Sequence, residues 1–512
     1  MDQTLPPLMQ ALLVPWRFPG ATSSVELVQT PISWVLLAGD LAYKIKKPLK
    51  LPFLDFSTLE KRHACCQEEL RLNQRYAPDL YLAVIPICNT PEDPQLEGTG
   101  EPIEYAVKMR RFDEAARLDR VCDRGELLPA HWTGLARTLV AFHGAAAVAP
   151  PDSLWGLPGE VVEPMHDNFF DLCALLPQAD VNARLMALQR WTEAQFAQLR
   201  PLMMARKHWG FVRECHGDLH LANMVLIDQQ VRLFDCIEFS EDLRWIDVAC
   251  EIAFTWMDLL AHGHPGLGNW FVNEVLSFSG DDEAALLLRF YAVYRALVRA
   301  KVAALPTGAG PGEALRYLAL AEQLTAPPPA RLVITHGLSG SGKTMQSSLL
   351  LQSDAQACTL RVRADVARKH LFGLESTACS HSPVGGGLYA AEAHDLTYAR
   401  LHTLADSLLR AGWSVVVDAT FLKRADRATF AKLAVDLGVP FSILAPSATP
   451  EQLRERIVAR QAAGADASEA TLQVLALQMK ELEPLLPDEL AACQSTSLGS
   501  MTPGAPATLA RR

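Results

Sequence analysis

The first part of the chain contains short runs of apolar residues, rich in Val, Ile, Leu and Tyr, which predict β-strands. Gly39-Asp40 supplies a turn between two of the runs. Two later runs frame a loop rich in Pro, Glu and Gly. Residues up to about 112 are therefore predicted to form a strand-rich lobe, with strands at residues 25–30, 33–39, 41–47, 80–87 and 103–112.

One helix is predicted within this lobe, from Ser57 to Tyr76. Ser57 is suited to cap it, and Glu60 three residues later completes a capping box. From Leu127 to Glu214, and again from about Trp245, the pattern is mostly helical. The stretch at 211–239 between them is predicted to form a loop and two short strands joined by a turn.

Prolines divide the chain near residue 325. Three consecutive prolines cannot continue a helix, and an apolar strand running into a glycine loop follows them. We therefore expect a first domain at residues 1–324, a Pro-rich linker at 325–330, a second domain at 331–494 and a disordered tail at 495–512.

The composition is that of a globular protein, since 49% of the 512 residues are apolar and 21% are charged. It excludes a collagen, a disordered protein and a small disulfide scaffold. Every long apolar stretch carries charge, which argues against a membrane protein, and the start of the chain does not resemble a secretory signal. The 11 cysteines include no CxxC pair. We expect reduced thiols and a cytoplasmic location. The net charge of −11 makes nucleic acid an unlikely partner.

The loop His216-Gly-Asp-Leu-His-Leu-Ala-Asn223 carries the first candidate chemistry. Phosphoryl transfer from ATP needs a carboxylate facing the attacking hydroxyl, and oxygen ligands for Mg²⁺ at the phosphates. Asp218 is the candidate catalytic base. Asn223, five residues on, and Asp235, twelve further, are the candidate metal ligands.

This spacing resembles the catalytic loop of protein kinases, and with Gly217 and the FDCIEF segment it resembles the aminoglycoside phosphotransferase branch more closely. The resemblance implies a bilobal kinase-like fold. It also implies that Lys44 binds the phosphates, with Glu68 or Glu69 as partner, of which we choose Glu69.

By the same resemblance Asp247 braces the catalytic loop, and residues 107–109 form the hinge that meets adenine. Lys46, Lys47 and Lys50 are interpreted as a solvated basic edge. The chain departs from the kinases between the first two strands, where residues 29–33 contain no glycine.

The second candidate site is a complete G-x-x-x-x-G-K-[ST] motif that follows an apolar strand and precedes a helical stretch. Its backbone N–H groups would surround phosphates, Lys343 would reach the β- and γ-phosphates, and Thr344 would ligate Mg²⁺. A Rossmann fingerprint does not fit the spacing. The nucleotide-binding residues proposed here are Gly337, Ser339, Gly340, Ser341, Gly342, Lys343 and Thr344.

The rest of this domain resembles small P-loop kinases related to polynucleotide kinase, zeta-toxin and gluconate kinase. By that resemblance Asp365 is a candidate base and Arg368 a contact to substrate or phosphate. Arg456 and Arg460 would be lid arginines, and Asp418 would lie near Mg²⁺ or the substrate. Gly385-Gly386-Gly387 is interpreted as a flexible loop.

Histidines 143, 216 and 220 raise the alternative of a zinc site, but their spacing does not favour it. The whole chain resembles a bifunctional family that joins an aminoglycoside phosphotransferase-like kinase domain to a P-loop, AAA-type ATP-binding domain. The fold class expected is α/β and α+β, multidomain, with a parallel sheet in the second domain.

We therefore predict an ATP- and Mg²⁺-dependent phosphotransferase with two nucleotide sites, acting on hydroxyl groups of small molecules. Two alternatives stay open. One is an ATP-sensing protein with one or both domains catalytically silent, and the other is a polynucleotide 5′-hydroxyl kinase.

Overall fold

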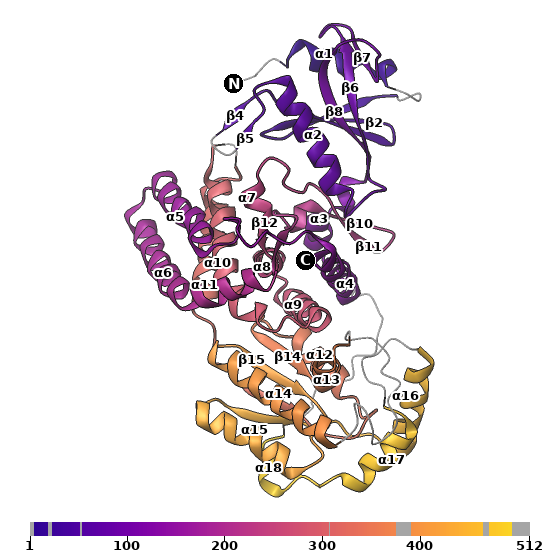
Figure 1. Ribbon diagram of the computed structural model, residues 1–512, viewed down its shortest axis with the longest axis vertical. Coiled ribbons are helices and arrows are strands. Elements are labelled where there is room, and N and C mark those ends of the chain that lie inside the picture. Colours follow the sequence, from indigo (N-terminus) through magenta and orange to yellow (C-terminus); the bar gives the residue numbers. More distant parts are fainter. Residues whose placement is uncertain are drawn as a thin grey trace, which may run out of the picture. The chain divides into compact units, whose positions relative to one another are not determined.

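The computed structural model describes residues 5–18, 23–51, 54–306, 308–374, 391–463 and 470–493. The chain divides after Pro327 into two compact units (Figure 1). The Gly385–Gly387 segment and the predicted tail from residue 495 lie outside the described residues. Among the described helices, none combines the length and the hydropathy that crossing a bilayer requires.

An antiparallel sheet of six described strands forms the first lobe of the N-terminal unit. Its central strand, β8, pairs with β3 on one side and β6 on the other. In sheet order the strands are β1 (Val25–Gln29), β2 (Ser33–Ala38), β3 (Leu41–Lys46), β8 (Pro102–Arg110), β6 (Tyr81–Asn89) and β7 (Pro94–Leu96). A small hairpin of β4 (Lys50–Leu51) and β5 (Leu54–Asp55) follows β3.

The two faces of β3 serve different purposes. Tyr43 and Ile45 belong to the apolar core of the lobe, which the short helix α1 (Pro7–Leu12) also joins. Side chains alternate along a strand, so Lys44 and Lys46 point to the opposite face. That face is next to helix α2 (Leu59–Asn73), which packs on β6 and β8 (Figure 1).

Helix α2 begins one residue later than the sequence indicated. Thr58, not Ser57, is the N-cap, and its hydroxyl accepts a hydrogen bond from the backbone N–H of Lys61. Ser57 instead bonds to Asp55. The buried positions Arg62, Cys66, Glu69 and Asn73 recur at helical spacing, so α2 buries a largely polar face.

The second lobe is mainly helical, as the periodicity predicted. Between its helices lie two small antiparallel strand pairs: β9 (Val212–Glu214) with β12 (Trp245–Asp247), and the hairpin of β10 (Met224–Ile227) with β11 (Gln230–Leu233). The helices are α3 (Leu118–Asp123), α4 (Pro129–Ala145), α5 (Pro158–Leu175), α6 (Ala179–His208), α7 (Glu241–Arg244), α8 (Val248–Ala261), α9 (Pro265–Ser279), α10 (Ala284–Ala304) and α11 (Pro311–Thr325).

The C-terminal unit contains a parallel sheet, with β13 in its interior between β15 and β16. Its strands are β14 (Thr359–Arg363), β15 (Ser414–Asp418), β13 (Leu332–Thr335) and β16 (Phe441–Leu444). The helices are α12 (Lys343–Gln352), α13 (Ala364–Leu371), α14 (Ala391–Arg410), α15 (Arg424–Leu437), α16 (Pro450–Ala463), α17 (Leu472–Glu481) and α18 (Pro487–Ala491). The expected fold class, mixed α/β and α+β in more than one unit, is confirmed by these sheets.

Candidate functional site

The loop between β9 and β10 brings Asp218 and Asn223 together. The Asn223 side-chain amide donates hydrogen bonds of 3.0 Å to the backbone carbonyl and to Oδ2 of Asp218. Asn223 is buried, while the Asp218 side chain is 36% exposed. The Asn223 amide oxygen and the second Asp218 oxygen remain for a ligand, which fits the roles proposed for them.

Asp218 is held as a carboxylate. Burial raises the pKa of Asp218, but the contact with His220, including its hydrogen bond, and the charge of Arg299 outweigh burial and hold the pKa well below its usual range. His220 Nε2 lies 3.3 Å from Asp218 Oδ2. Because Nδ1 of His220 accepts from the backbone N–H of Ala222, the proton of the neutral ring is on Nε2, where it donates to Asp218. Arg299 Nη1 lies 3.5 Å from the same Nε2 of His220.

Asp235 follows β11 in a left-handed backbone conformation, with φ of 62°. Its backbone N–H donates to the hydroxyl of Tyr81 at 3.0 Å, and its carboxylate pairs with Lys44. The preceding N–H, of Phe234, donates to the carbonyl of Asn223. The structure therefore brings the two proposed metal ligands to adjoining backbone segments.

Lys44 also lies 2.8 Å from Oε1 of Glu69, which is fully buried. Burial lowers the pKa of Lys44, but Asp235, Glu69 and Glu238 together raise it well above its ordinary value, so the ammonium stays charged. Glu68, the alternative partner, lies apart from Lys44 and pairs with Arg71 and Arg244.

The solvated basic edge predicted for Lys46 is wrong. Lys46 is fully buried and pairs with both Glu69 and Glu238. The reason is strand alternation, which places Lys46 on the face of β3 that also carries Lys44. Lys50, in contrast, is exposed.

The predicted hinge at residues 107–109 is also wrong. These residues lie within β8, where the backbone pairs with β3 on one side and β6 on the other. A strand paired on both sides has no free N–H or C=O for adenine. A hinge can begin only after Arg110, where β8 ends.

Helix α8 holds the catalytic loop through three polar side chains that the sequence reading missed. Glu251 Oε1 accepts from the backbone N–H groups of residues 216 and 217, at 2.5 and 3.0 Å. Thr255 donates to the carbonyl of Leu219, and Asp258 accepts from the N–H of Leu221. Their spacing of four and three residues places them on one helix face, which was the available signal.

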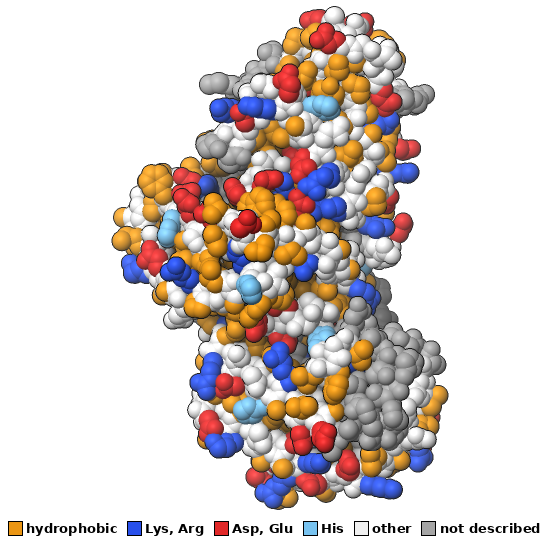
Figure 2. Space-filling view, viewed as in Figure 1, with side chains coloured by type: hydrophobic (Ala, Val, Ile, Leu, Met, Phe, Trp, Pro, Cys, Tyr) orange, Lys and Arg blue, Asp and Glu red, His pale blue; other side chains and the backbone are white. Residues whose placement is uncertain are grey.

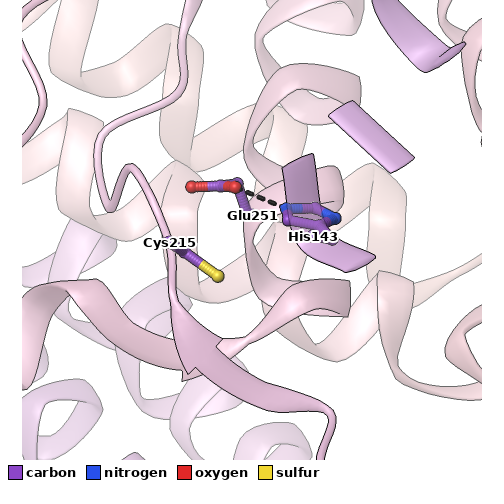
Figure 3. Close-up of side chains that lie close together, drawn as sticks. All are labelled: His143, Cys215 and Glu251. Carbon is purple, nitrogen blue, oxygen red and sulfur yellow. Dashed lines mark hydrogen bonds and ion pairs between the residues drawn. The ribbon is translucent and has the colours of Figure 1, made fainter. Parts of the chain in front are cut away.

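Glu251 also receives a 2.6 Å hydrogen bond from Nε2 of His143, on α4 (Figure 3). His143, Cys215 and Glu251 are close enough together to hold a metal ion. However, both oxygens of Glu251 already accept hydrogen bonds. Burial also raises the pKa of Cys215 well above its ordinary value, which keeps it a thiol. We therefore interpret the cluster as structural, because it supports the catalytic loop.

Among the described residues the Asp247 carboxylate forms no hydrogen bond or ion pair with the catalytic loop, contrary to the role implied by the resemblance. It caps α8 through the N–H of Ala249 and forms a bidentate pair with the buried Arg206, which also binds Asp281. Glu251, four residues later, has the bracing role instead.

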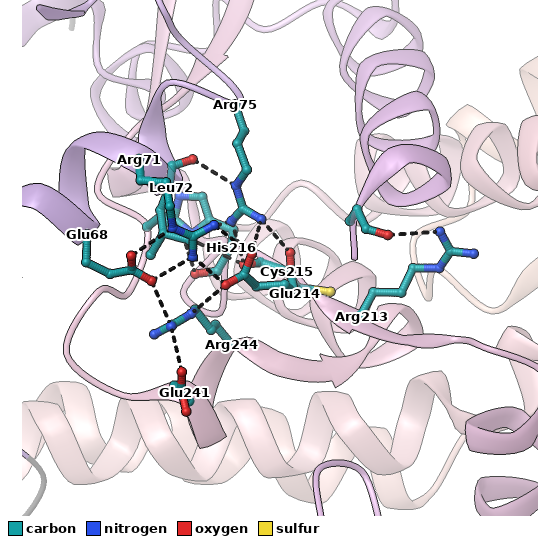
Figure 4. Close-up of polar contacts among 12 residues, drawn as sticks. Glu68, Arg71, Leu72, Arg75, Arg213, Glu214, Cys215, His216, Glu241 and Arg244 are labelled. Atoms are coloured by element: carbon teal, nitrogen blue, oxygen red, sulfur yellow. Dashed lines mark hydrogen bonds and ion pairs between the residues drawn. The ribbon is translucent and has the colours of Figure 1, made fainter. Parts of the chain in front are cut away.

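A charged network joins α2 to the strand before the catalytic loop (Figure 4). The carboxylate of Glu214, on β9, pairs with Arg71 of α2, with Arg75 in the turn after α2 and with Arg244. Arg75 also donates to the Glu214 carbonyl at 3.0 Å. Because α2 carries Glu69, the network connects the lysine partner to the catalytic loop.

In the C-terminal unit, the glycine loop of residues 337–344 connects β13 to α12. Gly340 and Gly342 have positive φ values of 85° and 105°. A Cβ on Gly340 would lie 3.0 Å from the carbonyl of Leu453, so a side chain there meets both strain and a close backbone. The loop thus presents its backbone at the N-terminus of α12.

Lys343 is buried, and its ammonium donates to the carbonyls of Gly337 and Leu338 at 2.8 Å. Burial lowers the pKa of Lys343 to about 8, although Asp418 and Asp365 act in the opposite direction. The hydroxyl of Ser341 is buried with no hydrogen-bond partner among the described residues. The loop therefore offers the Ser341 hydroxyl, and the Lys343 ammonium now bound to carbonyls, as donors to the oxygens of a triphosphate.

The other proposed residues of this unit gather around that lysine. Arg456 donates to the loop carbonyls of residues 340 and 341, at 3.1 and 3.3 Å. The charge of Arg460 acts on Lys343, and Arg368 pairs with Asp365 at 3.4 Å. Asp418 ends β15 and accepts from the hydroxyl of Ser347.

Gln478, on α17, was missed by the sequence reading. Its side-chain oxygen accepts from the backbone N–H of Ser339 at 2.8 Å. A lone glutamine in a helix gives no signal of such a contact. It occupies one of the N–H groups that the motif offers to phosphate.

Comparison with known proteins identifies the family to which the chain belongs. The chain is 30% identical over 462 residues to uncharacterized protein Rv2004c of Mycobacterium tuberculosis and to uncharacterized protein Mb2027c of Mycobacterium bovis, covering 89% of this chain and 90% of each relative. The chain belongs to the same family as these mycobacterial proteins. Within it, residues 332–485 match the family model described as an AAA domain.

Solved structures similar to the chain include two kinases. A choline/ethanolamine kinase family protein from Mesorhizobium loti is 11% identical, with a TM-score of 0.40, and the match covers 63% of this chain and 94% of that one. A spectinomycin phosphotransferase in complex with ADP and spectinomycin is 10% identical, with a TM-score of 0.34, covering 61% and 93%.

Proposed function

We propose that this protein is an ATP- and Mg²⁺-dependent phosphotransferase with one nucleotide site in each unit, acting on hydroxyl groups of small molecules. The observation that supports it best is the cluster in the N-terminal unit. Lys44 pairs there with both Glu69 and Asp235, and a carboxylate, Asp218, is held ionised beside Asn223.

In the N-terminal unit Asp218 faces the acceptor hydroxyl and takes its proton as the oxygen attacks the γ-phosphorus. One P–O bond forms, the bond to the bridging oxygen breaks, and ADP leaves. Lys44, positioned by Glu69, binds the α- and β-phosphates. Asn223 and Asp235 supply oxygen ligands for Mg²⁺, which neutralises charge on the phosphates.

In the C-terminal unit the loop of residues 337–344 surrounds the phosphates, with Lys343 and Thr344 in the roles that the motif assigns. Asp365, which pairs with Arg368 and whose charge acts on the lysine, is the proposed base. Arg456 and Arg460 neutralise charge on the transferring group, and Asp418 supports the metal.

The test is transfer of labelled γ-phosphate from ATP to a panel of hydroxyl-bearing metabolites. Asp218→Asn and Asp365→Asn should each abolish one activity. The matched controls are Asp228→Asn, in the turn between β10 and β11, and Asp436→Asn, on the surface of α15, and both should leave transfer unchanged. Full transfer by both active-site variants on every acceptor found would refute the assignments.

A second candidate for the N-terminal unit is ATP binding without transfer. The turn between β1 and β2 contains no glycine, and two of its backbone N–H groups are already bonded. The N–H of Thr30 donates to the carbonyl of Ser33, and the N–H of Ser33 donates to the Thr30 hydroxyl. That turn offers no clamp for phosphate. ATP binding without turnover on any acceptor would favour this sensing role.

A further inference from the structure

A cavity of about 230 Å³ lies in the helical lobe of the N-terminal unit, among α5, the α7–β12 segment and α10. Its walls are aromatic. The rings of Trp155 and Trp245 stack with centroids 4.6 Å apart and planes at 4°, and Tyr291 and Tyr294 line the α10 side. Flat apolar walls of this kind suit the faces of a small organic ligand.

Arg295 lines the α10 side of this cavity and is 4% exposed. Its guanidinium lies over the rings of Phe254 and Tyr294, at 4.7 and 5.2 Å. Its Nε has no hydrogen-bond partner, and among the described residues it forms no ion pair.

The neighbouring buried arginines differ in this respect. Arg206 pairs with Asp247 and Asp281, and Arg244 pairs with Glu214. No described carboxylate pairs with Arg295 and its Nε donor is unused, so an anionic group of a ligand in the cavity would be its ion-pair partner.

The outer part of the cavity is lined by acidic side chains, whose charge is opposite to that of Arg295. Glu160, Glu163 and Asp167 lie three and four residues apart on α5, are exposed, and pair with no described cation. Like charges at this spacing weaken a helix, and of the three only Glu160, in the first turn of α5, is favoured by the helix dipole. Asp242, across the cavity, accepts a hydrogen bond from the indole N–H of Trp155. Acidic side chains are visible over α5 and α7 in Figure 2.

These charges discriminate between classes of ligand. A purely cationic ligand would face Arg295 inside the cavity, and a purely anionic one would have to pass the carboxylates of α5. A ligand with an ammonium group at one end and an anionic group at the other satisfies both. We propose that the cavity binds an amphoteric, hydroxylated small molecule, with its carboxylate or phosphate on Arg295 and its ammonium among the outer carboxylates.

A chain of contacts links the cavity to the catalytic loop. The Arg295 guanidinium lies over the ring of Phe254 at 4.7 Å, the ring of Phe254 lies 5.5 Å from that of His220, and His220 Nε2 lies 3.3 Å from Asp218 Oδ2. Resting on the proposed function, the bound molecule is the acceptor whose hydroxyl Asp218 deprotonates. A buried water needs roughly 10–15 Å³ of cavity volume. The cavity volume of about 230 Å³ is therefore sufficient for a molecule of monosaccharide size.

Four matched probes separate the charges: glucosamine 6-phosphate has both, glucosamine only the ammonium, N-acetylglucosamine 6-phosphate only the anion, and N-acetylglucosamine neither. Muramic acid provides a carboxylate in place of the phosphate. Binding to the full chain without ATP is followed by calorimetry and by the fluorescence of the Trp155–Trp245 wall. The two amphoteric probes should bind about tenfold or more tighter than any single-charge probe.

Two variants locate the contacts. Arg295→Gln should remove the preference for the anion, and Asp167→Asn, at an exposed position that does not endanger folding, should weaken only probes with an ammonium group. Asp180→Asn, an exposed position on α6, is the control and should change nothing. Equal binding of all four probes, absence of binding by both amphoteric probes at millimolar concentration, or insensitivity to both variants would overturn the proposal.

Transfer from ATP to a bound probe is measured separately. If the amphoteric probes bind with the expected charge dependence but are not phosphorylated, the cavity assignment stands and its role as acceptor site fails. If transfer occurs to acceptors whose binding ignores Arg295 and Asp167, the proposed function stands and the cavity assignment fails.

Discussion

The carboxylate of Glu251, on α8, accepts a hydrogen bond from the backbone N–H of His216 at 2.5 Å. This bond fixes the start of the catalytic loop to a helix rather than to the sheet lobe. Since Glu251 is buried and also bonds to His143, the loop is held by a network that excludes water.

Removal of this carboxylate should loosen the loop. Glu251→Ala leaves two backbone N–H groups and His143 without partners, at about 1–3 kcal/mol for each unsatisfied buried group. We expect a lower free energy of unfolding, measured with urea, together with reduced kcat. Glu251→Gln should be milder because its amide oxygen still accepts. Glu241→Ala, at an exposed position, is the control, and an equal loss there would contradict the bracing role.

Lys46 and Glu238 form a buried pair whose energetics can be separated from catalysis. Lys46→Met leaves Glu238 buried beside Glu69 with one cation fewer, and breaking such a pair is expected to destabilise the fold by about 3–5 kcal/mol. The double variant Lys46→Met/Glu238→Leu should recover most of the thermal stability. If the single and double variants melt at the same temperature, the Lys46–Glu238 pair does not contribute to the stability of the fold.

Glu214 couples α2 to the catalytic loop through three arginines. Glu214→Ala should accelerate hydrogen exchange of the amides of α2, because the helix loses its anchor on the second lobe. Glu68→Ala is the matched comparison, since Glu68 is more exposed than Glu214. Similar protection of α2 in wild type and Glu214→Ala would show that packing alone holds the helix.

The pKa of Lys343, lowered by burial to about 8 from an ordinary 10.5, predicts a pH dependence of the C-terminal unit. Without nucleotide, the unfolded chain binds more protons than the folded chain between these two values, so stability should rise with pH across that window. Phosphate favours the charged lysine. ATP binding should therefore take up a proton and weaken as the pH rises above 8.

Proton uptake is measured by calorimetry in two buffers of different ionisation enthalpy. Lys343→Met should abolish both the uptake and the pH dependence. Lys432→Met, on the surface of α15, should leave both as in wild type. ATP affinity that does not change between pH 7 and 9, on either side of the pKa of about 8, would refute the explanation.

The sequence predicted those parts of the structure that depend on local pattern. The strands around Lys44 and the glycine loop before Lys343 follow from apolar runs and from a motif whose spacing the backbone requires. One prediction that proved wrong concerns buried charge. Lys46 is indistinguishable in sequence from a surface lysine, because its burial depends on carboxylates of α2 and of the segment after β11.

Long-range contacts explain the remaining differences. Glu251 meets the catalytic loop 35 residues before it in the chain, and Gln478 meets Ser339 across 139 residues. Neither partner is marked by a local pattern. Only the shared helix face of Glu251, Thr255 and Asp258 indicated that α8 bonds to a polar segment.

Two nucleotide sites on one chain are the central claim, and equilibrium binding of ATP with Mg²⁺ tests it most directly. The account predicts two bound nucleotides per wild-type chain, one after Lys343→Met, one after Asp235→Ala, and none in the double variant. A single site in wild type, or a stoichiometry unchanged by either substitution, would contradict it.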